Sequence, residues 1–331
     1  MSNVASIIIP VYNSEKSLEK LLMTLITQTY HNIEICMIDD GSTDSSSIII
    51  KKHMEKDKRI KYFYQENKGV SSARNLGLEM STGKYCCFVD ADDYLDSQYV
   101  FKLVEGIERK DVDMCISSYT YINEKNEPLY SYKDFSNNYL KKYDFINNIL
   151  ERNKMNSVLW NKIFKREIIE KNNLRFDTDI LIGEDFLFII EYIINIDRFY
   201  YIEDRLYYYN VSSNGILNEK KNNNSFNLKW YTEFDALDKI KNILIDNNLY
   251  DEVKTNYVHR LVSVINKLLF LSYYFENDSH PYLEKMRDVN KKQIPYIIFN
   301  KNYNIKFKIM TMLYTTMPKY VSIFKRRLCR N

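Results

Sequence analysis

The chain has 331 residues, of which 45% are hydrophobic and 27% are charged, and its formal net charge at pH 7 is only +3. This length and composition allow one large domain with a substantial core, with or without an extension. The nearly balanced charge excludes a protein whose whole surface binds nucleic acid, so we expect no nucleic-acid partner.

The cysteines and the apolar runs indicate the compartment. Five cysteines are present, and none form a C-x-x-C pair or a zinc-like spacing, so we predict reduced thiols in the cytoplasm. The first apolar run, residues 4–11, is too short for a signal peptide, and no run of about 18 apolar residues follows. We expect a cytoplasmic protein, with peripheral attachment to the inner face of the cell membrane left open.

The first hundred residues alternate short apolar runs with segments of helical spacing. This alternation predicts an α/β fold with a mostly parallel sheet and helices on both faces. In such sheets, ligands bind beyond the carboxyl ends of the strands. The expected strands cover residues 5–10, 33–38, 60–64 and 85–89, and the expected helices cover residues 15–27 and 70–80.

The pattern is more mixed in the next hundred residues and then turns helical. We place a domain boundary near residue 215. The predicted domain 1–215 has a nucleotide-binding half, 1–110, and an acceptor half, 111–215, and residues 216–331 form a helical C-terminal extension. Further expected strands cover 113–121 and the aromatic run 200–209, and further helices cover 143–150, 185–195, 225–247 and 253–275.

The last part of the sequence is basic. No acidic residue follows Asp288, while ten lysines and arginines are interleaved there with aromatic and aliphatic residues. This combination predicts a basic amphipathic tail that lies on an anionic membrane surface. A set of packed helices with a basic, solvated surface would give the same composition.

An acidic turn, Asp90-Ala91-Asp92-Asp93, follows the predicted strand 85–89. Three carboxylates in four positions repel one another unless a cation lies among them. Their hard oxygen atoms suit Mg²⁺ or Mn²⁺, and such an ion can neutralise a leaving diphosphate. A solvated acidic turn that precedes a helix is the alternative interpretation.

Two further polar features lie near strand ends. Asp39 and Asp40 follow the predicted strand 33–38, where a carboxylate can bind a pyrimidine N–H or a ribose hydroxyl, or can simply form a turn. Arg74 is the one cation of the segment 69–77. Its planar guanidinium can donate two parallel hydrogen bonds to a phosphate or to the edge of a base, or it can pair with a nearby acidic side chain.

Five strings in this order resemble the family 2 glycosyltransferases, which are inverting enzymes of the GT-A fold. They are SIIIPVYN (6–13), QTY (28–30), IDDGSTD (38–44), NKG with ARN (67–69 and 73–75) and DADD (90–93). The strong part of the resemblance covers residues 4–100, and a weaker part continues to about residue 215. The resemblance implies a Rossmann-like GT-A domain that binds a nucleotide-sugar.

The resemblance assigns the nucleotide pocket to residues near the first two strands. Pro10, Val11 and Tyr12 would line it, with Tyr12 near the base. Asp40 would accept a hydrogen bond from the base, with Asp39 beside it.

The resemblance also assigns the residues around the sugar diphosphate. Arg74 would face the base or the diphosphate, and Asp90 with Ala91 would face the ribose or the sugar. Asp92 would bind Mn²⁺ or Mg²⁺, with Asp93 in support.

Two later segments match the family. Relatives carry an acidic catalytic base at the position of Glu184-Asp185, so the resemblance implies Asp185 as the base and Glu184 as second choice. An acidic pair at a helix start also suits the helix dipole. Trp160, Asn161 and Lys162 match a string near the acceptor site, where Trp160 would stack on a sugar, although core packing would explain it too.

The predicted function is an inverting, metal-dependent glycosyltransferase of the hexosyltransferase type. We expect a UDP-sugar donor and a saccharide or lipid-linked glycan acceptor, as in the synthesis of capsule or another cell-surface polysaccharide. A nucleotidyltransferase is an alternative, although residues 10–14 lack its usual glycine-rich basic loop. A non-catalytic scaffold is the other alternative, although every matched acidic residue is present.

Overall fold

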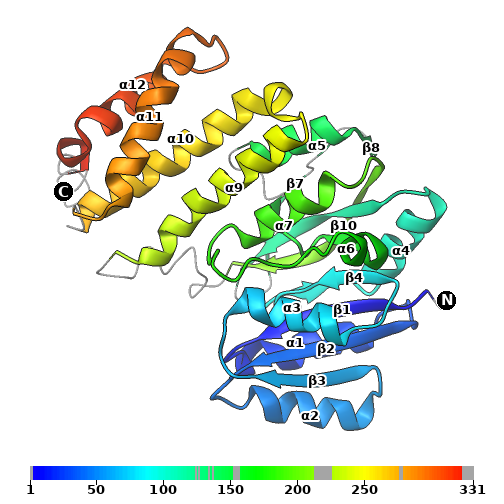
Figure 1. Cartoon of the computed structure of the whole chain (residues 1–331). Helices are drawn as coiled ribbons and strands as arrows, with labels where there is room; N and C mark the ends of the chain where they lie inside the picture. The colour runs from blue at the N-terminus through cyan, green and yellow to red at the C-terminus, as the bar shows by residue number, and fades with distance from the viewer. Residues whose placement is uncertain are drawn as a thin grey trace. The chain divides into compact units, whose positions relative to one another are not determined.

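The structure of the chain is a computed structural model (Figure 1). It describes residues 3–123, 125, 127–132, 135, 138–151, 157–211, 226–275 and 279–322. By their internal contacts, the residues divide into two compact units. Unit 1 comprises Met1–Phe145, Met155–Thr178 and Glu184–Gly215, and unit 2 comprises Ile146–Lys154, Asp179–Gly183 and Ile216–Asn331.

Unit 1 is built on a sheet with ten strands among the described residues. Eight strands follow one another in the order β3-β2-β1-β4-β9-β6-β10-β5, while β7 pairs with β6 and β8 pairs with β10. The strands are β1 (Ala5–Val11), β2 (Ile33–Asp40), β3 (Ile60–Gln65), β4 (Tyr85–Phe88), β5 (Tyr94–Leu95), β6 (Met114–Ile122), β7 (Pro128–Tyr132), β8 (Tyr139–Leu140), β9 (Lys162–Lys165) and β10 (Phe199–Asn210).

The longest strand pairings are parallel. Strand β1 is parallel to both β2 and β4, β2 is parallel to β3, and β6 is parallel to β10. Strands β1 and β2 consist mainly of β-branched and other apolar residues and are almost entirely buried, as expected for strands covered on both faces. The predicted α/β fold with a mostly parallel sheet is confirmed.

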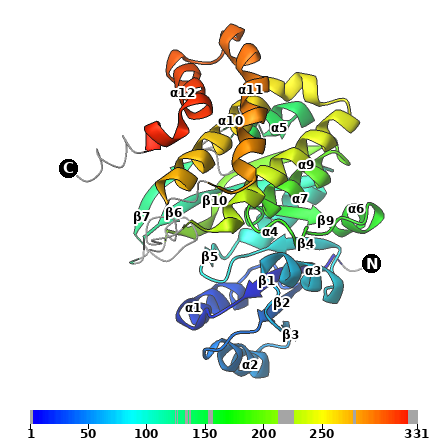
Figure 2. The ribbon, with the colours of Figure 1, turned by 60° about the vertical axis from the view of Figure 1, so that its left-hand side comes forward.

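Helices cover both faces of this sheet. Buried side chains of α1, α2 and α4 pack with alternate residues of β1 and β2 in one hydrophobic cluster. Helix α3 contacts the same two strands, and Figure 2 shows α1 and α3 on opposite sides of them. The helices of unit 1 are α1 (Glu15–Ile26), α2 (Ser46–Lys56), α3 (Val70–Met80), α4 (Tyr99–Arg109), α6 (Arg166–Lys171) and α7 (Glu184–Ile193), and α5 (Lys142–Leu150) begins in unit 1.

Gly77 allows α3 to approach the sheet closely. A Cβ atom at this position would lie 2.3 Å from Cγ2 of Ile8, inside van der Waals contact. Because Ile8 itself is fully buried, it has little room to move away. The close approach fixes the height of α3, and therefore of Arg74 on it, above the sheet.

Four of the described strands, β5, β7, β8 and β9, add antiparallel pairings that are not predicted from the sequence, and β7 is antiparallel to β6. Strand β9 lies between β4 and β6 and is antiparallel to both. The two-residue strands β5 and β8 are antiparallel to β10. Each of the four strands has at most five residues, too few to show a clear periodic pattern.

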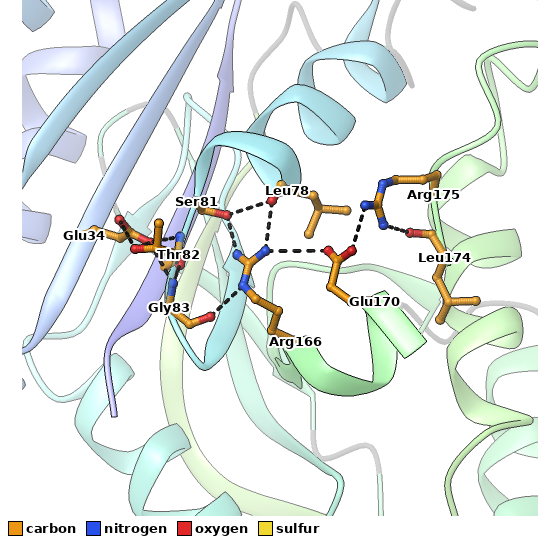
Figure 3. A network of polar contacts seen from close by, with 10 residues as sticks. Glu34, Leu78, Ser81, Thr82, Gly83, Arg166, Glu170, Leu174 and Arg175 are labelled. Atoms are coloured by element: carbon orange, nitrogen blue, oxygen red, sulfur yellow. Dashed lines mark hydrogen bonds and ion pairs between the residues drawn. The ribbon is translucent and has the colours of Figure 1, made fainter. Parts of the chain in front are cut away.

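A buried carboxylate stabilises the opposite end of β2. Glu34 accepts hydrogen bonds from Ser6 Oγ at 2.6 Å, from the Gly83 N–H at 2.9 Å and from Lys61 Nζ at 2.5 Å. Burial opposes its ionisation, but these donors hold the pKa of Glu34 at about 2. Figure 3 shows that Arg166 reaches the same turn from α6 and donates to the Gly83 carbonyl at 2.6 Å.

The described residues of unit 2 are mainly helical, which confirms the predicted helical C-terminal extension. Buried apolar residues of α9 and α10 form much of its interior, and α12 contacts both α10 and α11. Among the described helices, none is both long enough and apolar enough to cross a bilayer. The elements are η2 (Leu228–Tyr231), α9 (Thr232–Asp246), α10 (Tyr250–Tyr274), α11 (Tyr282–Phe299) and α12 (Ile305–Thr316).

Candidate active site

Strands β1, β2 and β4 end at one edge of the sheet, because they are parallel neighbours. Val11 pairs with Asp39 at the ends of β1 and β2. The Val89 N–H donates to the Ile8 carbonyl, so the chain beyond β4 reaches Asp90 at the same edge. The residues predicted to bind nucleotide and metal are therefore brought together here.

Asp39 and Asp40 are buried and hold the loops around them. Asp39 accepts a hydrogen bond from Tyr62 Oη at 2.7 Å. Asp40 accepts from the backbone N–H groups of Lys68 at 2.8 Å and Gly69 at 2.9 Å, immediately before α3. Both carboxylates have fixed positions at the strand edge, and their contact with a base stays a prediction.

Of the three residues predicted to line the nucleotide pocket, Tyr12 is the accessible one. Its side chain is 51% exposed, whereas Val11 is fully buried and Pro10 is partly buried. The next residue, Asn13, has a positive φ of 49°, and its Oδ1 accepts from the Thr43 N–H at 2.8 Å. This bond ties the loop after β1 to the loop after β2, next to the open face of Tyr12.

The acidic turn after β4 is tethered to β10. Asp93 is fully buried and accepts hydrogen bonds from Tyr207 Oη at 2.6 Å and from the Asn210 N–H at 2.8 Å. Tyr207 Oη also accepts from the Asp90 N–H at 3.3 Å. Asp92, in contrast, is exposed. The structure therefore separates Asp93, which holds the turn, from Asp92, which faces solvent.

The electrostatics of this turn suit a cation. Although Asp92 as a residue is exposed, partial desolvation of its carboxyl group and the nearby Asp90 carboxylate raise the pKa of Asp92 to about 6. This rise in pKa means that no nearby positive charge of the protein stabilises the Asp92 carboxylate sufficiently. A bound cation would supply such a charge. The described residues contain no group of three or more His, Cys, Asp or Glu side chains that could enclose a metal by themselves. Asp92 fits a metal shared with diphosphate oxygens.

Arg74 joins the acidic turn to the start of α7. Its Nη1 donates to Asp185 Oδ1 at 2.6 Å and to Glu184 Oε1 at 3.0 Å, and its Nη2 donates to Asp90 Oδ1 at 3.3 Å. Only 5% of the Arg74 side chain is exposed. The guanidinium thus connects two acidic motifs that are about ninety positions apart in the sequence.

The carboxylates around Arg74 outnumber the single positive charge that they contact. Three carboxylates face one guanidinium, an excess of two negative charges when all are ionised. Burial raises the pKa of Asp185 well above its ordinary value, although the nearby Arg74 opposes the rise. Burial raises the pKa of Asp90 as well, again against Arg74. Burial thus favours the protonated form of these two carboxyl groups, whereas Arg74 favours their ionised form.

Neighbouring residues fix the Arg74 side chain. Asn75 donates to the Phe176 carbonyl and accepts from the Phe176 N–H, both at 2.8 Å. The Phe176 ring stacks on Phe188 of α7 with 4.2 Å between centroids, and it lies 5.4 Å from the Arg74 guanidinium carbon. Asn75 has no role that its local sequence could indicate, because its partner is a hundred residues away in the chain.

Trp160, Asn161 and Lys162, predicted near the acceptor, have buried side chains. The Trp160 ring stacks on Tyr207 at 4.4 Å, and Asn161 Nδ2 donates to the Ser117 carbonyl. In this arrangement the three side chains pack inside unit 1, so an acceptor could reach them only after they became exposed. Their contact with the acceptor stays a prediction.

A separate cavity of about 440 Å³ lies in unit 2, between α10 and α12. Its lining includes Ser263, Asn266 and Phe270 from α10 and Phe307 and Tyr314 from α12. It contains none of the predicted site residues and no acidic side chain. The acidic edge of the sheet therefore remains the candidate active site.

Residues 6–172 match the model of the family "Glycosyl transferase family 2". The glycosyltransferase GlyA of Streptococcus pneumoniae is 38% identical over 213 residues, which cover 62% of this chain but only 30% of GlyA. A crystal structure of S. aureus TarS residues 1–349 in complex with UDP is similar, with a TM-score of 0.65 and 20% identity over 96% of this chain and 88% of that one. The mannosyltransferase PcManGT of Pyrobaculum calidifontis, in complex with GDP-Man and Mn²⁺, has a TM-score of 0.54 and 15% identity over the same shares.

Proposed function

The chain belongs to glycosyl transferase family 2, and from this premise we propose that it is an inverting, metal-dependent glycosyltransferase that transfers a hexose from a UDP-sugar. The observation that carries the proposal is the Arg74 cluster, which holds Asp90 of the metal-binding motif and Asp185 of the predicted base motif around one guanidinium.

In the proposed reaction, Asp185 takes the proton from the acceptor hydroxyl while that oxygen attacks the anomeric carbon. The bond between this carbon and the diphosphate breaks on the opposite side, and its electron pair leaves with the nucleoside diphosphate. One step inverts the anomeric centre, so no protein nucleophile is needed. Glu184, on the same guanidinium nitrogen, is the second candidate for the base.

Asp92 would hold the divalent ion, Mn²⁺ or Mg²⁺, and Asp93 would keep the turn in place through β10. When bound, the ion would neutralise the charge that develops on the leaving diphosphate. Asp90 would remain on the sugar side of the turn, oriented by Arg74.

We place the uracil ring against the exposed Tyr12 and close to Asp40. Complex formation of the similar TarS fragment with UDP supports a uridine donor. For the acceptor we propose a saccharide or lipid-linked glycan of a cell-surface polysaccharide, such as capsule, at the inner face of the membrane. The absence of acidic residues after Asp288 supports contact with anionic lipid.

Calorimetric titration of the whole chain with UDP, GDP and CDP, each with and without Mn²⁺, tests the proposal. We expect UDP to bind most tightly, to require Mn²⁺, and to lose binding in an Asp92→Ala variant. Asp197→Ala is the matched control, because that side chain is 85% exposed and pairs only with a lysine among the described residues, so it should bind UDP normally.

Equal UDP binding by Asp92→Ala would contradict the assignment of the metal site. If the folded protein bound none of the three nucleotides, the result would favour a non-catalytic scaffold. Transfer of the nucleotide itself, seen as release of pyrophosphate from UTP, would favour a nucleotidyltransferase.

A further inference from the structure

Helix α12 carries a stripe of large apolar side chains that face solvent. Ile305 is 70% exposed, Ile309 is 49%, Met312 is 45% and Leu313 is 37%. Their spacing of four, seven and eight residues from Ile305 places them on one face of the helix. The opposite face is buried through Thr311, Tyr314 and Thr315. Helix α12 therefore packs in unit 2 through one face, and the apolar stripe on its other face is exposed among the described residues.

Lysines lie on both sides of this stripe. At about 100° per residue, Lys306 and Lys308 project on opposite flanks of the line through Ile305 and Ile309. Lys306 also lines the cavity between α10 and α12, and Lys308 Nζ donates to the Ile298 carbonyl at 2.7 Å, at the end of α11. Long lysine side chains can keep their charge in the polar headgroup layer while apolar neighbours are buried below it. The arrangement is that of a helix lying in a membrane interface.

The end of α11 continues the same character. Ile298 is 40% exposed and Phe299 is 84% exposed, and Lys301 follows in the connection to α12. The sequence also holds four arginines and lysines in residues 323–331, and no acid after Asp288. An anionic surface would therefore meet no repelling carboxylate along this part of the chain.

We propose that α12 and the end of α11 form an interfacial membrane-binding surface, which inserts Phe299, Ile305 and Ile309 among anionic lipids. A second copy of the chain is a poorer cover, because a twofold contact through the stripe would bring the lysines of both copies together. Membrane binding through this surface would bring the proposed glycosyltransferase to a lipid-linked acceptor. The binding itself does not depend on the proposed function, but this purpose of the binding rests on it.

The test is co-sedimentation of the whole chain with vesicles of phosphatidylcholine alone or of phosphatidylcholine mixed with phosphatidylglycerol. We expect binding to the mixed vesicles only. The double variant Ile305→Ser/Ile309→Ser should weaken binding by at least about tenfold, because each buried isoleucine contributes strongly. Lys306→Gln/Lys308→Gln should weaken it by about fivefold for each charge removed, and added salt should reduce that difference.

Matched controls come from unit 1, where Met23 is 51% exposed on α1 and Ile48 is 68% exposed on α2. Met23→Ser/Ile48→Ser should bind vesicles as the unchanged protein does. UDP titration separates the two proposals, since every variant should keep UDP binding even if vesicle binding is lost. Equal vesicle binding by the α12 variants would overturn the proposal, and so would a dimer that dissociates when Ile305 and Ile309 are replaced.

Discussion

Replacing Arg74 with methionine removes the cation that contacts Asp90, Glu184 and Asp185, while methionine preserves much of the side-chain volume. Removing one partner of a buried ion pair typically costs about 3–5 kcal/mol. Since Arg74 is 5% exposed and its contacts measure 2.6–3.3 Å, its site belongs to that class. Uptake of a proton by one carboxyl group offsets part of the loss, so we expect unfolding free energy to fall by about 3 kcal/mol at neutral pH.

The sign of the pH dependence follows from the same contacts. Arg74 lowers the pKa values of Asp90 and Asp185 in the folded state, so its removal raises them further. A carboxyl group whose pKa is raised by folding stabilises the folded state at low pH and loses this contribution as pH rises through the folded value. The stability deficit of Arg74→Met should therefore grow as pH rises and shrink in acid. Its transfer rate should fall at least about a hundredfold, with the acidic limb of the pH profile moved to higher pH.

Urea unfolding at a series of pH values measures the deficit, with Arg166→Met as the matched control. Arg166 is also largely buried, and it donates to the Gly83 carbonyl at 2.6 Å, to the Leu78 carbonyl at 2.9 Å and to Ser81 Oγ. Its ion pair with Glu170, which is 43% exposed, is longer at 3.7 Å. Its loss should lower stability by an amount that changes little with pH. If both variants showed the same pH trend, or if the deficit of Arg74→Met were constant, the carboxylate cluster would not be what Arg74 compensates.

Two further predictions concern stability. Glu34→Gln should lower the unfolding free energy by about 3 kcal/mol at neutral pH, because folding lowers the pKa of Glu34 to about 2. This contribution is complete above the unfolded pKa of about 4.5 and is lost as pH falls towards about 2, so the variant and the unchanged protein should converge in acid urea titrations; a constant gap would contradict the assignment. Gly77→Ala should lower the midpoint of thermal unfolding, because its Cβ would meet Ile8 at 2.3 Å; an unchanged midpoint would show that α3 can shift.

The sequence predicts the parallel half of the fold well because its signals are local. Strands β1 and β2 are largely apolar runs followed by polar turns, and helix α1 between them has a clear apolar spacing. The aromatic strand predicted over 200–209 is found as Phe199–Asn210. Strand β9 is missed because Lys162–Lys165 has only four residues and begins at the last residue of the segment interpreted as an acceptor site.

The candidate site is predictable as a list of residues but not as a set of contacts. The motifs place Asp90 and Asp185 in one enzyme, whereas their common contact with Arg74 spans more than a hundred positions from α3 to α7. The same applies to Asp93, whose partners Tyr207 and Asn210 lie on β10, a strand to which the sequence assigns no site residue. Composition and spacing report which chemical groups are present, but long-range packing decides which of them meet.

The tether between Asp93 and β10 has a consequence for donor affinity. Two hydrogen bonds to a buried carboxylate keep the turn after β4 in one conformation before any nucleotide arrives. The conformational entropy of this turn is therefore lost when the protein folds. Because it is not lost again when the nucleotide donor binds, it does not lower the donor affinity. The carboxylate that we propose as the metal ligand, Asp92, is in this sense preorganised, and on that proposal the affinity for the donor depends in part on Tyr207, which need not touch the donor.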